Sequence, residues 1–288
     1  MSDPATTMNT YEVAHDQALY LLGFSPNLET TSEPNIDYAT SVMIKYLGVE
    51  YVKVSGVIAW YKKIDRCDFE GDQGEKNLSD IQWLTPRVIA HERVVSGLSQ
   101  QFPFYPSRFG TLFSSKISLG AFALSAQKTL LAFFTNIGEK LEWGLKFYGD
   151  PFRAAEILAQ RDGILLEGKP QGGANYLKLR RLQREQNISK QSVLIQSYER
   201  ALRSLQSQYQ NVVSRPIVAA KNESTREEIV GNLAILVSPH ESKKLIHWAN
   251  DWNQTQISES ATRVEITGPW PAYSFCPSLS PVQINEAA

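Results

Sequence analysis

The chain has 288 residues, of which 42% are hydrophobic and 20% are charged, and its formal net charge at pH 7 is −1. This length allows two ordinary domains with sizeable cores, and the near-neutral charge leaves no basic footprint for a nucleic acid or an anionic membrane. Cys67 and Cys276 are the two cysteines. We expect free thiols in a reducing cytoplasm, while a disulfide between them stays open at this stage.

The first part of the chain shows strand patterns interrupted by a polar segment. Residues 19–24 form an apolar run of strand length, and the Pro- and Ser-containing residues 25–40 are predicted to be a loop. The β-rich runs 49–54 and 57–61 flank Ser55-Gly56, which is typical of a hairpin.

A loop and a helix follow. Residues 65–80 are acidic and lack the spacing of a calcium-binding EF-hand, so we expect a solvated loop. Residues 84–102 are predicted to form a helix that Thr85 caps and whose first turn contains Pro86. His91-Glu92 lacks the second histidine of a zinc protease motif, so His91 is interpreted as a surface or packing residue.

Residues 102–113 form an aromatic, proline-punctuated run in which Arg108, next to Phe109, is the one charge. Such an arginine needs a carboxylate or carbonyls; it either ties two elements together or binds a ligand anion. Residues 116–136 are predicted to form an apolar helix. Its serine, threonine, glutamine and asparagine side chains, with Lys128, favour a buried core helix over a membrane span.

The second half begins with the clearest strand of the chain. Residues 141–148 alternate cleanly, with one face formed by Leu141, Trp143, Leu145 and Phe147. A short helix (150–160), a Gly-rich linker (163–173) and a long helical stretch (174–213) with a basic first half follow. Strands at 216–220 and 233–237, a helix from the Ser238 cap to residue 252 and a strand at 263–267 complete the order.

The residues after that last strand are rich in proline and aromatic side chains. Gly268, Pro269 and Pro271 are expected to end the strand, because a proline cannot donate to the ladder. They leave three rings on a stiff backbone, those of Trp270, Tyr273 and Phe275. The segment is interpreted as an aromatic clasp on a core, as a partner-docking edge, or as both.

This order predicts an α+β protein with two domains. Residues 1–138 form an N-terminal α+β domain, residues 139–276 follow the β-α-β-β-α-β order of a ferredoxin-like domain enlarged by its long helical crossover, and residues 277–288 are a polar tail.

Several stretches together resemble the gas vesicle protein F/L family. They are Tyr-Leu-Leu-Gly at 20–23, Tyr-Pro-Ser-Arg-Phe-Gly-Thr-Leu-Phe at 105–113, Leu-Glu-Trp-Gly-Leu-Lys-Phe-Tyr at 141–148, Gly-Gly-Ala-Asn-Tyr-Leu at 172–177 and Gly-Pro-Trp-Pro-Ala-Tyr-Ser-Phe at 268–275. They run in family order over nearly the whole chain. Ala272 stands where the family often has another proline, and the choice between an F-type and an L-type member stays open.

The resemblance implies a non-enzymatic, minor structural or accessory protein of the gas vesicle, the gas-filled, protein-walled cytoplasmic organelle that gives buoyancy. Such a protein is expected to bind the small hydrophobic wall protein, alongside other accessory proteins, and to prevent its aggregation during nucleation. It implies no catalytic residues, cofactor, metal, nucleic acid, membrane or small-molecule substrate. The structural or partner-contact candidates are Arg108, Phe109, Trp143, Trp270, Tyr273 and Phe275.

Two other functions compete with this one. A small-anion sensor or enzyme on tandem ferredoxin-like domains would use Arg108 and the basic residues 178–184, and it requires a deep polar pocket around Arg108. RNA binding on a ferredoxin-like sheet would require exposed aromatic rings with a basic surround, and the near-neutral charge argues against it.

Overall fold

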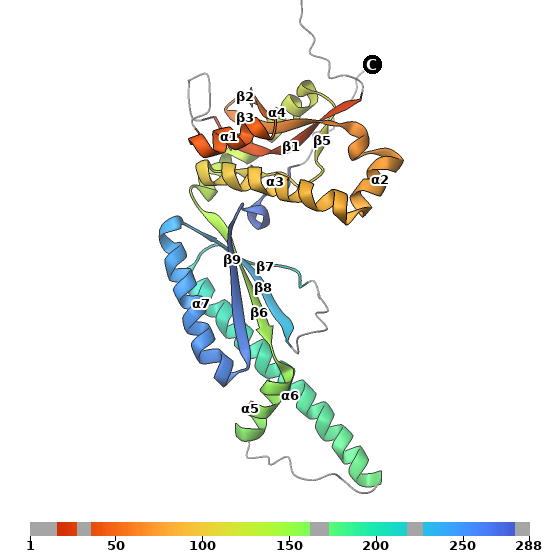
Figure 1. The fold of residues 1–288 in the computed structure, drawn as a ribbon. Helices are drawn as coiled ribbons and strands as arrows, with labels where there is room; N and C mark the ends of the chain where they lie inside the picture. The colour runs from red at the N-terminus through yellow and green to blue at the C-terminus, as the bar shows by residue number, and fades with distance from the viewer. Residues whose placement is uncertain (1–15, 28–35, 162–172, 218–226, 280–288) are drawn as a thin grey trace, which may run out of the picture. The chain divides into compact units, whose positions relative to one another are not determined.

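The structure is a computed structural model that describes residues 16–27, 36–161, 173–217 and 227–279, without the side chains of 159–190. It is an α+β protein with two antiparallel sheets (Figure 1). Contacts divide the chain into two units, residues 1–139 together with 271–288, and residues 140–270. The sequence predicts a boundary at 138/139 and keeps residues 271–276 in the second domain, whereas the contacts group those residues with the first unit.

The first unit is built around a five-stranded sheet with the order β2-β3-β1-β4, in which β5 also pairs with β1. Its elements are β1 (Gln17–Pro26), α1 (Tyr38–Tyr46), β2 (Val49–Val54), β3 (Val57–Asp65), the 3₁₀ helix η1 (Arg66–Asp68), α2 (Gly71–Ser79), α3 (Ile81–Gln101), β4 (Tyr105–Pro106), β5 (Leu112–Phe113), α4 (Lys116–Ile137) and the 3₁₀ helix η2 (Tyr273–Phe275).

Helices cover both faces of this sheet, and a bulge in β1 allows it. Leu22 packs in one core cluster with Val94 of α3, whereas the Phe24 ring lies 6.1 Å from that of Phe122 in α4. The register of β1 against β3 shifts between Leu21 and Gly23, so residues two apart face opposite sides. Gly23 is required there, because its φ is 154° and a Cβ would lie 2.4 Å from the Tyr105 carbonyl oxygen.

The predicted hairpin is confirmed, since β2 and β3 pair antiparallel around Ser55 and Gly56, both at positive φ. The loop predicted at 65–80 is wrong, because residues 71–79 form α2. The Gln73 side chain donates to Asn77 one turn later, and the Asn77 side chain donates to the Asp68 carbonyl. These polar contacts stabilise helix α2, which composition alone did not indicate.

Two helix starts also differ from the sequence prediction. Helix α1 (38–46) begins within residues 25–40, which are predicted to be a loop, and its N-cap Asp37 accepts from the Thr40 amide at 2.7 Å. Helix α3 begins at Ile81 rather than Leu84, because Asp80 caps it and accepts from the Gln82 amide. Thr85 is therefore not the cap, and Pro86 lies inside the helix.

By length and composition alone, helix α4 could cross a membrane. In its most apolar 18-residue stretch, 33% of the residues are buried in the protein. The prediction of a buried core helix holds for one face, where Leu119, Ala123, Leu130 and Phe133 are buried. It is wrong for the opposite face, where Ile117, Leu124 and Leu131 are 84%, 55% and 38% exposed. These three are seven residues apart, two helical turns, and so form one strip along the helix.

The second unit is a four-stranded antiparallel sheet of order β7-β8-β6-β9. Its elements are β6 (Leu141–Gly149), α5 (Pro151–Arg161), α6 (Gly173–Gln208), β7 (Val212–Ser214), β8 (Glu228–Val237), α7 (Pro239–Glu259) and β9 (Thr262–Trp270). Leu145 and Phe147 of β6 are buried with residues of α6 and α7, which confirms the predicted alternation. Ser238 and Glu241 form the predicted cap as a capping box.

Three predictions in this unit need correction or lie outside the description. The strand predicted at 216–220 is found earlier, at Val212–Ser214, and residues 218–226 are outside the described part. Of the linker predicted at 163–173, residues 163–172 are outside it too, and Gly173 begins α6. β9 does not end at Gly268. The ladder slips between Glu142 and Gly144 and resumes with Trp270 opposite Glu142, so the irregularity lets the strand pass a residue that lacks an N–H.

The outer edge of β9 is occupied by a side chain of α7. Asn253 accepts from the Val264 amide at 2.7 Å and donates to the Val264 carbonyl at 2.9 Å. It thereby satisfies backbone groups that would otherwise be open to another strand.

Asn253→Ala is expected to lower the free energy of unfolding by about 1–3 kcal/mol, since two backbone groups lose their partner, and to increase aggregation on heating. Urea unfolding and light scattering measure the two effects. Gln254→Ala, at an exposed neighbouring position, is the control and should change neither. Equal behaviour of the two variants would show that Asn253 does not protect this edge.

Candidate functional site

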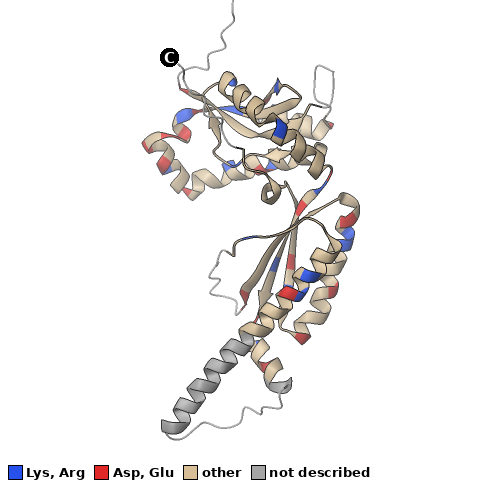
Figure 2. Ribbon diagram, turned by 180° about the vertical axis from the view of Figure 1, so that it is seen from behind, with Lys and Arg blue, Asp and Glu red and all other residues tan. Residues whose placement is uncertain are grey.

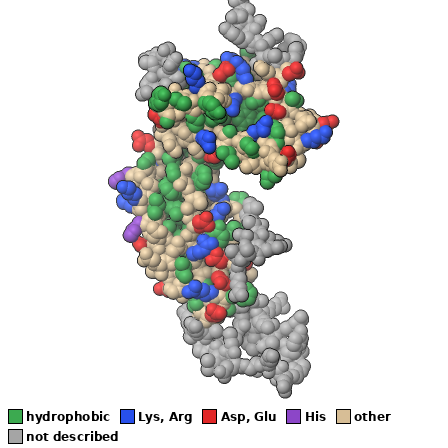
Figure 3. Space-filling model, in the orientation of Figure 1, with side chains coloured by type: hydrophobic (Ala, Val, Ile, Leu, Met, Phe, Trp, Pro, Cys, Tyr) green, Lys and Arg blue, Asp and Glu red, His purple; other side chains and the backbone are tan. Residues whose placement is uncertain are grey.

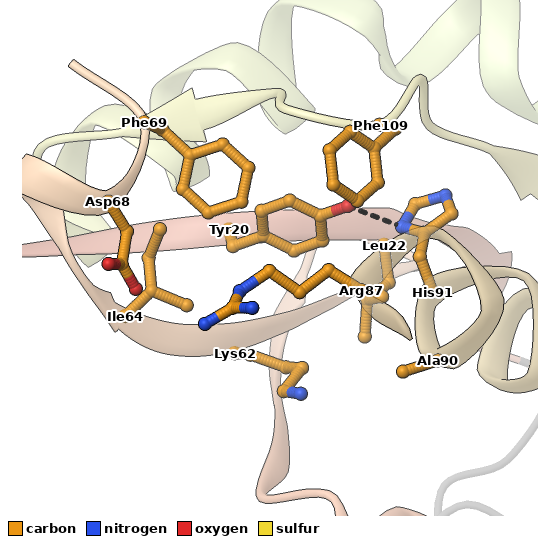
Figure 4. A pocket seen from close by; sticks show the side chains of 10 residues that line it. All are labelled: Tyr20, Leu22, Lys62, Ile64, Asp68, Phe69, Arg87, Ala90, His91 and Phe109. Carbon is orange, nitrogen blue, oxygen red and sulfur yellow. Dashed lines mark hydrogen bonds between the residues drawn. The ribbon is translucent and has the colours of Figure 1, made fainter. Parts of the chain in front are cut away.

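A pocket of about 120 Å³ lies in the first unit between β1, β3 and α3. Its floor is aromatic. The Tyr20 ring lies 5.4 Å from that of Phe69 and 5.7 Å from that of Phe109, and the Phe109 ring is 5.7 Å from His91. Leu22, Ile64 and Ala90 add aliphatic surface, while Lys62, Asp68 and Arg87 also line it (Figure 4). Phe109, a candidate from the sequence, is thus a wall of this pocket.

His91 holds the back of the pocket together. Its Nδ1 lies 2.7 Å from the Tyr20 hydroxyl (Figure 4). Its Nε2 lies 3.4 Å from the hydroxyl of Tyr273 in η2. Tyr273 also donates to the Glu92 carboxylate at 3.0 Å. Tyr20 and Tyr273, which are 71 and 182 positions from His91 in the chain, therefore meet at one buried imidazole.

Burial controls the ionisation of this group. It lowers the pKa of His91 to about 4, against the smaller opposing effect of a hydrogen bond with the Ser107 backbone. Burial likewise raises the pKa of Glu92, Tyr20 and Tyr273. At neutral pH the imidazole is therefore uncharged, and its Nδ1 shares a hydrogen bond with the Tyr20 hydroxyl. This arrangement is suited to holding segments together, because its hydrogen bonds join residues from distant parts of the chain.

A second pocket, of about 370 Å³, lies beside the loop that carries Arg108. Tyr273 and Cys276 line it too, and Tyr105 donates to the Pro277 carbonyl at 2.9 Å. The Arg108 side chain is exposed, which does not favour the role of an arginine that ties two elements together. What joins the elements is instead the Tyr105 and Tyr273 hydroxyls, while the Arg108 carbonyl accepts from Thr111.

The other candidates have different environments. Trp143 of β6 packs against the core cluster of the second unit. Trp270 is 42% exposed at the end of β9 and donates to the Thr267 hydroxyl at 3.3 Å, so it closes no core. Phe275 is partly buried in η2. The structure brings Arg108, Phe109, Tyr273 and Phe275 into the first unit and leaves Trp143 and Trp270 in the second.

Sequence reasoning missed the central residue, His91. The available signal was its place in a run of α3 whose buried residues His91, Val94, Val95 and Leu98 share one face. Lysine and arginine are interspersed with aspartate and glutamate over both units (Figure 2). Among the described residues no group of three His, Cys, Asp or Glu side chains could hold a metal ion. The basic side chains at 178–184 are outside the description.

Fold and site together define a two-sheet α+β protein whose distant segments are joined at aromatic and tyrosine contacts. Residues 18–277 match the family described as gas vesicle synthesis protein GvpL/GvpF. The chain belongs to this family and has a gas vesicle accessory role, in association with gas vesicle proteins.

Individual relatives agree with this assignment. Gas vesicle protein L of Streptomyces sp. (strain CB03234) is 24% identical over 215 residues, covering 72% of this chain and 75% of that protein. The crystal structure of GvpF from Anabaena sp. PCC7120 is similar in fold, with a TM-score of 0.61, 15% identity and coverage of 91% and 97%. The crystal structure of GvpF from Microcystis aeruginosa is also similar in fold, with a TM-score of 0.59 and 15% identity, covering 91% of this chain and 99% of that one.

Proposed function

We propose that this chain binds the small hydrophobic wall protein of the gas vesicle and prevents its aggregation during nucleation and assembly. It acts in the cytoplasm, on the vesicle and among other accessory proteins, by holding a polypeptide rather than by catalysis. A wall subunit exposes apolar surface and strand edges before it polymerises, and both promote aggregation. A binder that covers such surface removes the hazard.

The observation that carries this proposal is the apolar strip of α4, Ile117, Leu124 and Leu131. Large side chains that remain in contact with water in a row are typical of a surface that meets another chain. Complete burial of such a side chain is worth about 1.5–3 kcal/mol. Hydrophobic side chains also gather over α1 in the first unit (Figure 3), where Tyr38, Val42 and Tyr46 are exposed at four-residue spacing. Arg108 and Trp270 are the exposed candidates from the sequence.

In the second unit a sheet edge is a weaker docking place than these helices. The Asn253 side chain hydrogen-bonds with the backbone amide and carbonyl of Val264 on the outer edge of β9. The other edge strand of that sheet, β7, has only three residues. The strip of α4 therefore supports helix-in-groove recognition better than strand addition.

For the second unit we propose an enlarged ferredoxin-like domain. The order β6-α5-α6-β7-β8-α7-β9 and the strand order β7-β8-β6-β9 support this proposal. The sequence-based proposal is a first domain of residues 1–138, a second of residues 139–276 and a tail of residues 277–288; the contacts modify it by grouping residues 271–276 with the first unit.

Small-anion binding is the second candidate, because Arg108 lines the pocket of about 370 Å³. The polar groups there are largely used within the chain, however. The hydroxyl of Thr111 donates to the Arg108 carbonyl and that of Tyr105 to the Pro277 carbonyl. A rise in melting temperature with a small anion, lost in Arg108→Gln, would favour this alternative.

The proposed function is tested by co-expressing the wall protein with the wild-type chain or with the triple variant Ile117→Gln, Leu124→Gln, Leu131→Gln. The wild type should raise the soluble fraction of the wall protein. The triple variant should lose most of this effect, because roughly 4 kcal/mol of apolar contact corresponds to about a thousandfold in Kd.

The matched control is Ser125→Gln, Thr129→Gln, Asn136→Gln, at exposed polar positions of the same helix that lie roughly 100° or more around the axis from the strip, and it should behave as the wild type. Both triple variants should melt as the wild type does. If the wild type leaves wall-protein solubility unchanged, the function is wrong. If the wild type and the Ile117 triple variant keep the wall protein equally soluble, the proposed function stands and the α4 strip is not the docking surface.

A further inference from the structure

The pocket of about 120 Å³ has the size of a side chain rather than of a cofactor. Small-molecule sites occupy about 300–1,000 Å³, whereas an engineered cavity of about 150 Å³ holds one benzene. The floor offers only rings and aliphatic groups. The Tyr20 hydroxyl and the His91 ring, which are polar, are already bonded to each other, so the occupant of this floor must be apolar.

The rim of the pocket carries excess positive charge. Lys62 from β3 and Arg87 from α3 lie on one side of the aromatic floor, and Asp68 is the single carboxylate that lines it (Figure 4). The Arg87 guanidinium stacks 3.9 Å from the Trp83 ring centre and donates to the Trp83 carbonyl. Among the described residues neither cation forms an ion pair. Both cations are thus available to a carboxylate placed at the mouth of the pocket.

We infer that this pocket is a docking site for a segment of a partner polypeptide that presents one aliphatic or aromatic side chain beside an acidic residue. The apolar side chain enters between Tyr20, Phe69 and Phe109, and the carboxylate meets Lys62 and Arg87. A buried anchor surrounded by a charged rim is the arrangement that concentrates binding energy at protein interfaces. The inference rests on the proposed function, because it assumes a polypeptide partner, and it names a second contact besides α4.

The test is an NMR titration of the full chain with acetyl-Leu-Glu-amide, up to about 10 mM, where a millimolar Kd is near saturation. Shifts should concentrate at Lys62, Arg87 and Phe109. Acetyl-Leu-Lys-amide should bind about threefold to fivefold more weakly, as expected for the loss of one partly exposed ion pair. Acetyl-Ala-Glu-amide should bind more weakly as well, because it lacks the anchor.

Two variants and a control locate the binding. Ala90→Leu fills the pocket from α3 and should abolish the shifts, whereas Ala132→Leu, at an exposed position of α4, should leave them unchanged. Lys62→Gln should weaken binding of the Leu-Glu probe but not that of the Leu-Lys probe, because it removes attraction for the first and repulsion for the second. No shifts at the highest concentration, equal affinity for the two Leu probes, or full binding by Ala90→Leu would overturn the inference.

Two further outcomes answer two separate questions. The first is whether the pocket binds a polypeptide or a small molecule, and the second is whether the wall protein docks in this pocket. Tighter binding of free 4-methylpentanoate than of the dipeptide would indicate a small-molecule site and contradict a polypeptide anchor. If Ala90→Leu loses the dipeptide but still keeps the wall protein soluble, the pocket is refuted as its docking place while the proposed function stands.

Discussion

Trp60→Ala is expected to lower the free energy of unfolding of the first unit by about 3–5 kcal/mol, the range for removing a buried tryptophan. Trp60 lies on β3 and is 1% exposed. Its ring is 5.3 Å from that of Tyr51 and 6.3 Å from that of Phe102, and its Nε1 donates to the buried Ser25 hydroxyl at 2.9 Å. The variant loses the packing and the hydrogen bond together.

Trp60→Phe separates these two contributions. It keeps most of the apolar volume but leaves the Ser25 hydroxyl without its donor, so a loss of about 1–3 kcal/mol is expected. Urea unfolding followed by far-UV circular dichroism measures both variants. A loss below about 1 kcal/mol for Trp60→Ala would mean that this ring is not in the core of the first unit.

Acid is expected to destabilise the first unit through His91. Burial lowers the pKa of His91 to about 4, while an unfolded histidine titrates near 6.5. Above about pH 6.5 both states are neutral and the unit has its full stability. Between about pH 6.5 and 4 the unfolded state binds a proton that the folded state does not, so stability falls as the pH falls, by about 2–3 kcal/mol in total.

The measurement is the free energy of unfolding between pH 7 and 4.5 for the wild type and for His91→Gln, which keeps hydrogen-bonding capacity but does not titrate. The difference between the two proteins should shrink as the pH falls, and comparing them cancels carboxylates such as Glu92, whose raised pKa acts in the opposite direction. A difference that stays constant across this range would place the His91 ring in water.

Three of the sequence stretches that resemble the family contact one residue, His91, in the folded protein. Tyr20 belongs to the first stretch, the Ser107 backbone to the second and Tyr273 to the last, and all three contact the same imidazole. The accessory role of the chain requires a stable surface, and these contacts hold the loop of Arg108 and the C-terminal segment on the sheet. The proposed docking pocket uses Tyr20 on one side while His91 positions it from the other.

Elements with strong local signals were predicted correctly from the sequence. The alternation of residues 141–148, the Ser55-Gly56 turn and the Ser238 cap each specify their structure within a few residues. Elements whose support comes from elsewhere were missed. Helix α2 depends on Asn77 reaching the Asp68 carbonyl, and β9 passes Pro269 only because β6 accepts a shifted register.

The sequence by itself determined the α+β class, the strand order along the chain and the family, because periodicity, caps and short motifs are local properties that survive without the fold. Only the tertiary structure decided that Trp270 is exposed while Trp60 is buried, that Arg108 faces water, and that His91 joins β1, the 105–111 loop and η2. Burial and hydrogen-bond partners depend on which distant segments meet, and the pairing of residues 71 and 182 positions apart leaves no trace in local composition.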